Sequence, residues 1–105
     1  MRILFDQGTP VPLRAHLDGH TIRTAFELGW SNLQNGELLA AAEAAFDLLI
    51  TTDQQMRYQQ NISRRQLAVL VLPTTSWPRL KKSIPEIRAA IEICNPGDYW
   101  ELLLT

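Results

Sequence analysis

The main pattern in this chain is a series of apolar runs, each of which ends at polar residues or proline. Three of them are continuous: Ile3-Leu4-Phe5 before Asp6, Leu48-Leu49-Ile50 before Thr51-Thr52-Asp53, and Leu67 to Leu72 before Pro73. Unbroken apolar runs of this length are typical of parallel strands, because both faces of such strands are covered. They predict strands over residues 2–5, 48–50 and 67–72, and the pattern from His20 to Arg23 predicts a further short one.

Helix start signals fall between these runs. Thr9-Pro10 has the residue types of an N-cap and a first helical position, and Asn35 reads as the N-cap of a helix with apolar side chains on one side. Residues 54–60 are also expected to be helical. Ser83-Ile84-Pro85-Glu86 has capping-box spacing before an amphipathic stripe, and alternation over residues 99–104 predicts an edge strand.

Strands that alternate with helices imply parallel pairing through right-handed crossovers. At 105 residues the chain has the length of one domain, and its hydrophobic content can build a modest core. We therefore expect a single α/β domain over residues 1–105, a three-layer α/β/α sandwich with a mainly parallel sheet of four or five strands. One cysteine, Cys94, excludes an internal disulfide, and no apolar run reaches membrane-spanning length, so we expect a cytoplasmic protein.

Three carboxylates are the main candidates for chemistry. Asp6 and Asp53 follow two predicted strands, and Glu37 lies at a predicted helix start near the same edge of the sheet. Converging carboxylates repel one another unless a cation joins them, and oxygen ligands favour Mg²⁺ or Mn²⁺. Each acid also has an ordinary explanation: Asp6 as a turn residue, Glu37 as a charge at a helix N-terminus and Asp53 as an N-cap.

Basic residues are concentrated in the second half of the chain. Between Gln54 and Pro85 there is no Asp or Glu, but the segment holds six cations: Arg57, Arg64, Arg65, Arg79, Lys81 and Lys82. A basic sector beside strand-end acids suits a phosphate-backbone ligand such as RNA. Arg57, Tyr58 and Gln59 offer a cation, an aromatic face and an amide for bases. The alternative is an ordinary polar surface.

The succession of these segments resembles a known family. The resemblance rests on five segments in order: Met1 to Asp6, Gly19-His20, Glu27 to Trp30, Asn35 to Leu39 and Leu49 to Asp53. Through them the chain resembles the short PIN-like family of uncharacterised proteins. Its members look like trimmed relatives of PIN-domain ribonucleases.

The resemblance implies Mg²⁺- or Mn²⁺-dependent cleavage of RNA, often as the toxin of a toxin–antitoxin pair. It carries catalytic and metal-binding roles to Asp6, Glu37 and Asp53, and it makes an antitoxin protein and a homodimer candidate partners. In the same reading Arg64 and Arg65, with Arg57, hold the RNA backbone.

The sequence also departs from the family pattern. Gln7, Asn35 and the pair Gln54-Gln55 stand where many relatives have acids. A second hypothesis is therefore a catalytically silent module that binds RNA or protein. A third is a receiver-like domain with Asp53 as phospho-acceptor, Thr74 or Thr75 as the later hydroxyl and Lys81 or Lys82 as the later lysine.

Overall fold

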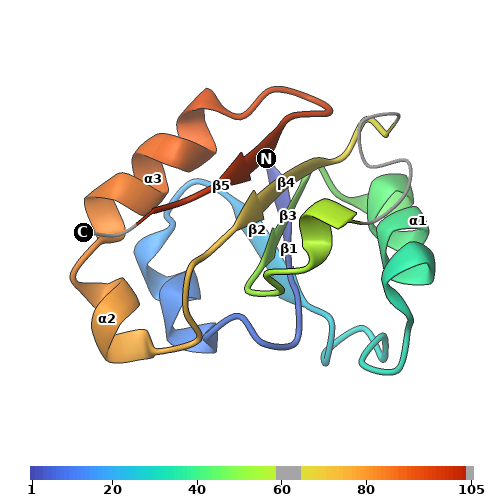
Figure 1. Cartoon of the computed structure of the whole chain (residues 1–105), viewed down its shortest axis with the longest axis horizontal. Helices are drawn as coiled ribbons and strands as arrows, with labels where there is room; N and C mark the ends of the chain where they lie inside the picture. The colour runs from blue at the N-terminus through green and yellow to red at the C-terminus, as the bar shows by residue number, and fades with distance from the viewer. Residues whose placement is uncertain (59–64, 104–105) are drawn as a thin grey trace.

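A five-stranded, all-parallel sheet forms the centre of the molecule, seen in a computed structural model that describes residues 1–58 and 65–103 (Figure 1). The strand order is β2-β1-β3-β4-β5. The strands are β1 (Arg2–Phe5), β2 (Thr21–Thr24), β3 (Leu48–Thr51), β4 (Ala68–Val71) and β5 (Tyr99–Glu101). The predicted parallel sheet is confirmed, and all five strands form, β5 over fewer residues than its alternation indicated.

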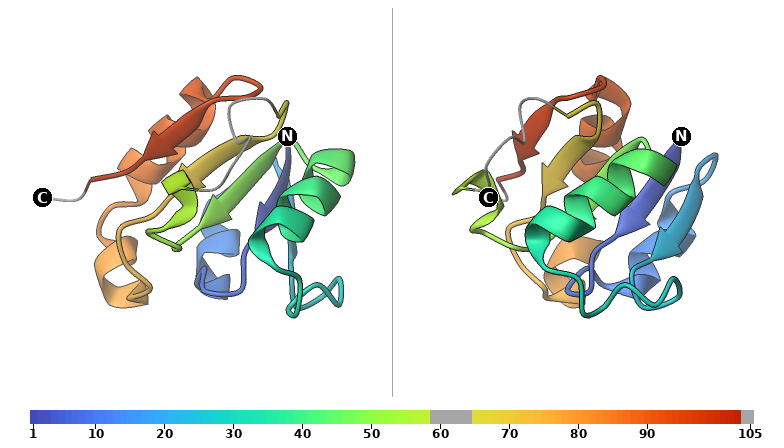
Figure 2. Two further views of the ribbon diagram at one scale, coloured as in Figure 1. Left: turned by 45° about the vertical axis from the view of Figure 1, so that its right-hand side comes forward. Right: turned by 90° about the vertical axis from the view of Figure 1, so that its right-hand side faces the viewer.

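Helices cover both faces of this sheet. They are the 3₁₀ helices η1 (Val11–His16) and η2 (Met56–Tyr58) and the α-helices α1 (Asn35–Ala45), α2 (Trp77–Lys81) and α3 (Ile84–Ile93). In the right-hand view of Figure 2, α1 lies in front of the sheet, whereas α2 and α3 lie behind it. The predicted three-layer α/β/α sandwich is therefore confirmed.

The alternation of side chains along each strand divides the core into two apolar layers. Ile3 and Phe5 of β1 contribute to the layer under η1, α2 and α3, while Leu4 contributes to the layer under α1. The central strand β3 is buried at all four positions, which is why it reads as an unbroken apolar run. β2, at the edge, alternates between exposed and buried residues.

Two predicted helix starts are displaced by one residue, and the capping bond predicted at a third does not form. Thr9 is not an N-cap, because Pro10 takes that place and the Thr9 hydroxyl donates to the Ile50 carbonyl. Gln34, not Asn35, is the N-cap of α1. Ser83 precedes α3 as predicted, but its side chain makes no cap bond, because its φ of −123° and ψ of 24° lie outside the extended region that caps use.

Helix formation over residues 54–60 is limited to the three residues of η2, and residues 59 and 60 lie outside the described part of the chain. Buried Met56 anchors η2 to the α1 side of the core. Cys94 is also a core residue, and burial raises the pKa of its thiol to about 11, so that it stays protonated at neutral pH. None of the helices described is both long and apolar enough to cross a bilayer.

Candidate metal centre

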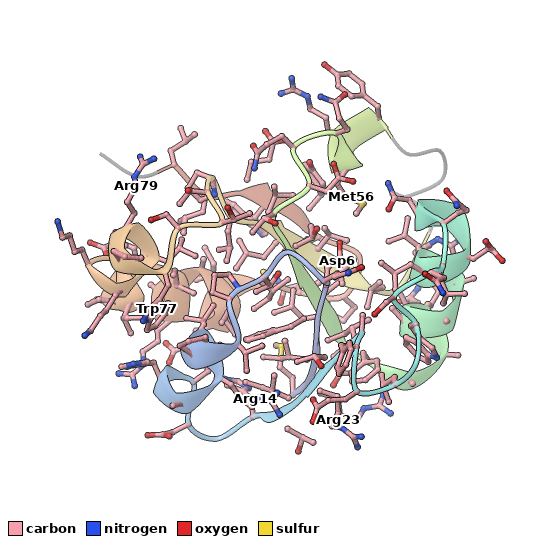
Figure 3. The ribbon with its side chains drawn as sticks, turned by 90° about the horizontal axis from the view of Figure 1, so that it is seen from below. Asp6, Arg14, Arg23, Met56, Trp77 and Arg79 are labelled. Carbon is pink, nitrogen blue, oxygen red and sulfur yellow. The ribbon has the colours of Figure 1, made fainter. Side chains whose placement is uncertain are left out.

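The strand order creates a switch point between β1 and β3. From β1 the chain crosses to β2 on one side, and from β3 it continues to β4 and β5 on the other. Parallel α/β sheets bind ligands where such connections diverge, outside the carboxyl ends of the strands. Asp6 directly follows β1 and Asp53 comes two residues after β3, so both acids lie at this point. Figure 3, viewed from below, places Asp6 near the middle of the face.

The hydroxyl of Thr51 joins the two acids. Thr51 is the last residue of β3 and is completely buried. Its Oγ1 donates to Oδ2 of Asp6 at 2.8 Å and accepts a hydrogen bond from the backbone N–H of Asp53 at 3.1 Å. Oδ1 of Asp6 accepts from the Gln7 N–H at 2.7 Å. One buried hydroxyl thus fixes the Asp6 carboxylate and the Asp53 backbone beside each other.

The Asp53 carboxylate is oriented by two further donors. Its Oδ2 accepts from Nδ2 of Asn35 at 3.0 Å, and its Oδ1 accepts from the Gln55 N–H at 2.9 Å. Asn35 is the first residue of α1, so this bond links the helix start to the strand end. A carboxylate has about four acceptor positions. Asp6 and Asp53 each use two within the protein, which leaves capacity for a cation.

Glu37 lies at the start of α1 but bonds to its own helix cap and not to the other two acids. Its Oε1 accepts from the Gln34 N–H at 3.3 Å in a capping box, and the side chain is exposed. Within residues 1–58 and 65–103, no three His, Cys, Asp or Glu side chains form a group that could hold a metal ion. The structure therefore brings Asp6 and Asp53 to one hydroxyl and places Glu37 on its own helix cap.

Three loops meet beside this pair of acids. A Cβ on Gly8 would lie only 2.5 Å from Oγ1 of Thr52 and 3.8 Å from Cγ2 of Thr75. The loop after β1 can approach the loop after β3 this closely because residue 8 has no side chain. The loops after β1, β3 and β4 thus bring Gly8, Thr52 and Thr75 close together.

Gln54 fixes the loop after β3 in place. Its Nε2 donates to the carbonyl oxygen of Leu72 at 2.7 Å and to that of Thr52 at 3.1 Å. These bonds tie the ends of β3 and β4 together. An acid at this position would have no hydrogen to donate, so the glutamine has a structural reason to stand here.

We expect Gln54→Glu to lower the free energy of unfolding by about 1 to 2 kcal/mol, because a carboxylate would lose both bonds and face two carbonyl oxygens. Urea denaturation at pH 7 measures the change. Gln55→Glu is the matched control, since Gln55 bonds to Asp53 through its backbone N–H, which the substitution keeps. Equal stability of the two variants would contradict this role for Gln54.

Two of the predicted RNA-binding arginines already interact with side chains of the protein. Arg65 lies 3.1 Å from Glu43, whose other oxygen accepts from the Gln66 N–H at 2.7 Å. Arg57 stacks over the Tyr58 ring at 4.9 Å and lies 3.8 Å from Glu101. Gln59 and Arg64, the other two residues of that prediction, lie outside the described part of the chain.

Tyr99 and Glu101 are neighbours of this cluster that the sequence patterns did not single out. The Tyr99 hydroxyl donates to Oε2 of Glu101 at 2.8 Å. Burial, and then the Glu101 carboxylate, raise the pKa of Tyr99, and the negative charge of Asp53 acts in the same direction. Tyr99 therefore remains a neutral donor. Only strand alternation marked these residues in the sequence, and it carries no chemical signal.

Comparison with protein-family models, with curated proteins and with solved structures gave no match. What the site can do follows from its own atoms. Asp6 and Asp53 offer carboxylate oxygens as metal ligands. The side chains of Thr51 and Asn35 donate hydrogen bonds to these carboxylates. Such an all-oxygen set suits a hard divalent cation such as Mg²⁺ or Mn²⁺ and is unsuited to softer metals that prefer sulfur or imidazole.

Proposed function

We propose that the protein is a Mg²⁺- or Mn²⁺-dependent ribonuclease that hydrolyses RNA phosphodiesters at the switch point of its sheet. One observation carries the proposal: the buried hydroxyl of Thr51 bonds both to the Asp6 carboxylate and to the backbone N–H of Asp53, an acid 47 positions further along the chain. Buried polar groups that hold acids in place at a ligand-binding position of the fold are typical of a preorganised site.

The residues have distinct roles in this proposal. Asp6 and Asp53 bind the cation, Thr51 and Asn35 orient these two carboxylates, and Glu37 supplies a third carboxylate once it leaves the Gln34 N–H. When bound, the divalent ion would activate water and stabilise the negative charge that develops on the phosphate. The capping bond of Glu37 is exposed and long, so its loss on metal binding costs little.

A wider proposal rests on the sequence resemblance. We propose membership of the short PIN-like family, with RNA as substrate, an antitoxin protein and a second copy of the chain as partners, and the cytoplasm as location. The observed sandwich is the architecture that this reading requires.

Metal dependence is the first test. Purified full-length protein is incubated with mixed single-stranded RNA in Mn²⁺, in Mg²⁺, or in EDTA, and the fragments are separated on a gel. We expect cleavage with either metal, none in EDTA, and recovery when excess Mn²⁺ is added back. Cleavage that persists in EDTA, or no cleavage with either ion, would count against the proposal.

A catalytically silent binding module is the second candidate, and the Asn35–Asp53 bond favours it. An amide that already occupies one Asp53 oxygen replaces a further acid that would help to hold a cation. RNA binding in EDTA without cleavage in Mn²⁺ would select this candidate. The receiver-like alternative has less support, because Gln7 replaces one member of the acid pair that receiver domains have after their first strand. Stable labelling of Asp53 by a small phosphodonor would select it.

A further inference from the structure

The arginines of this chain differ in whether an acid compensates their charge. Four of them lie in ion pairs: Arg2 with Asp47, Arg14 with Glu27, Arg57 with Glu101 and Arg65 with Glu43. Arg79, Lys81 and Lys82, here called the α2 cations, are exposed and pair with no acid in the described ranges 1–58 and 65–103. Arg23 on edge strand β2 is exposed and unpaired in the same sense. The α2 cations are three such charges within four consecutive residues.

The loops connect α2 directly to the candidate metal centre. A Cβ on Gly8, which is two residues after Asp6, would lie 2.5 Å from Oγ1 of Thr52 and 3.8 Å from Cγ2 of Thr75, two residues before α2. Oγ1 of Thr74 accepts from the Ser76 N–H at 3.0 Å, and Oγ of Ser76 accepts from the Arg79 N–H at 3.4 Å. Several hydroxyl-bearing residues thus lie between Gly8 and the first of the α2 cations.

α2 is held firmly enough to present these charges in a fixed place. Leu80 is completely buried in the core layer on that side, and the Trp77 ring lies 5.5 Å from the ring of His16 in η1. Figure 1 shows α2 at the lower edge of the molecule, toward which the strands run. Figure 3, viewed from that edge, shows Arg79 and Trp77 to one side of Asp6.

We propose that the α2 cations bind the phosphates of single-stranded RNA next to the phosphate that a cation bound by Asp6 and Asp53 would hold. The inference rests on the proposed function, and it moves the backbone contacts from Arg57 and Arg65 to α2. A compensated arginine gains less from a phosphate, because it must leave its carboxylate first, whereas an uncompensated exposed cation only releases bound counterions. The hydroxyls of Thr74 and Thr75, just before α2, add possible donors for phosphate and ribose oxygens.

The test measures binding apart from cleavage. Fluorescence anisotropy of a labelled single-stranded RNA, about 12 nucleotides long to span a typical single-strand site, is recorded with the full chain in EDTA over a series of NaCl concentrations. The variant is Arg79→Gln with Lys81→Gln, and the matched control is Arg2→Gln with Arg88→Gln, which removes the same charge from other parts of the surface. We expect the α2 variant to bind about tenfold more weakly at ~100 mM salt and its salt slope to fall by about 1.4, at roughly 0.7 per phosphate contact.

The control variant should bind within about twofold of the wild type, and circular dichroism shows whether both fold. Equal affinities of the two variants would overturn the inference while leaving cleavage untouched. RNA binding that depends on α2 without any cleavage in Mn²⁺ would support the inference and overturn the proposed catalysis. Equal wild-type affinity for an oligoglutamate of the same charge would overturn it, because the surface would then fit an acidic protein.

Discussion

Asp53→Asn and Asp6→Asn are each expected to lower the rate of Mn²⁺-dependent RNA cleavage by about a hundredfold or more. Each change replaces one of the two carboxylates that would bind the ion with a neutral amide, and loss of a charge that stabilises the reaction costs several kcal/mol in such sites. The fold should survive, because an amide in place of the Asp53 carboxylate still has one oxygen, which can accept from either Asn35 or the Gln55 N–H. Cleavage rates at saturating RNA, with thermal unfolding of each variant, measure both effects.

Two controls locate the effect. Asp47→Asn changes an exposed acid that pairs with Arg2 near the other end of the sheet, and cleavage should be unchanged. Glu37→Gln keeps an oxygen for the Gln34 N–H, so that α1 should remain capped while the third carboxylate is lost. We expect its rate to fall by less than that of Asp53→Asn. Full activity of Asp53→Asn would remove the acids at the switch point from the mechanism.

Thr51→Val is expected to have the second largest effect. Valine has nearly the shape of threonine, but it leaves Oδ2 of Asp6 without its donor and the N–H of Asp53 without its acceptor. Because these groups are partly buried, the free energy of unfolding should fall by about 1 to 3 kcal/mol. Loss of an orienting partner behind metal-binding residues typically costs ~10- to 100-fold in metal affinity or activity, so the Mn²⁺ concentration for half-maximal cleavage should rise accordingly.

Thr51→Ser separates positioning from packing. Serine keeps the hydroxyl and loses one buried methyl group, worth about 1 kcal/mol of stability. We therefore expect Thr51→Ser to be destabilised but to keep the Mn²⁺ dependence of the wild type. If Thr51→Val and Thr51→Ser show the same Mn²⁺ dependence, then Thr51 contributes packing alone.

The strands and layers could be predicted because burial restricts which residue types a strand can contain. A strand covered on both faces must be apolar at every position, and Leu48-Leu49-Ile50 meets that condition at the centre of the sheet. An acid right after such a strand must emerge at its carboxyl end. The positions of Asp6 and Asp53 at one edge therefore followed from the predicted parallel pairing of β1 and β3.

The partners of the polar side chains could not be predicted, because they depend on distances between loops. Asn35 has the residue type of an N-cap, yet its amide reaches Asp53 once α1 begins one residue earlier. Arg65 has the charge that an RNA contact needs, yet in the fold it pairs with Glu43 on α1. Glu37 satisfies its own helix cap, a local bond that competes with any role at the candidate metal centre.

Anomalous diffraction from crystals soaked in Mn²⁺ tests the central claim most directly. We expect an anomalous peak about 2.0 to 2.3 Å from at least one carboxylate oxygen of Asp6 and one of Asp53, with Thr51 still bonded to Asp6. A map without a peak between these two acids at millimolar Mn²⁺, with both carboxylates keeping only their protein partners, would contradict the account.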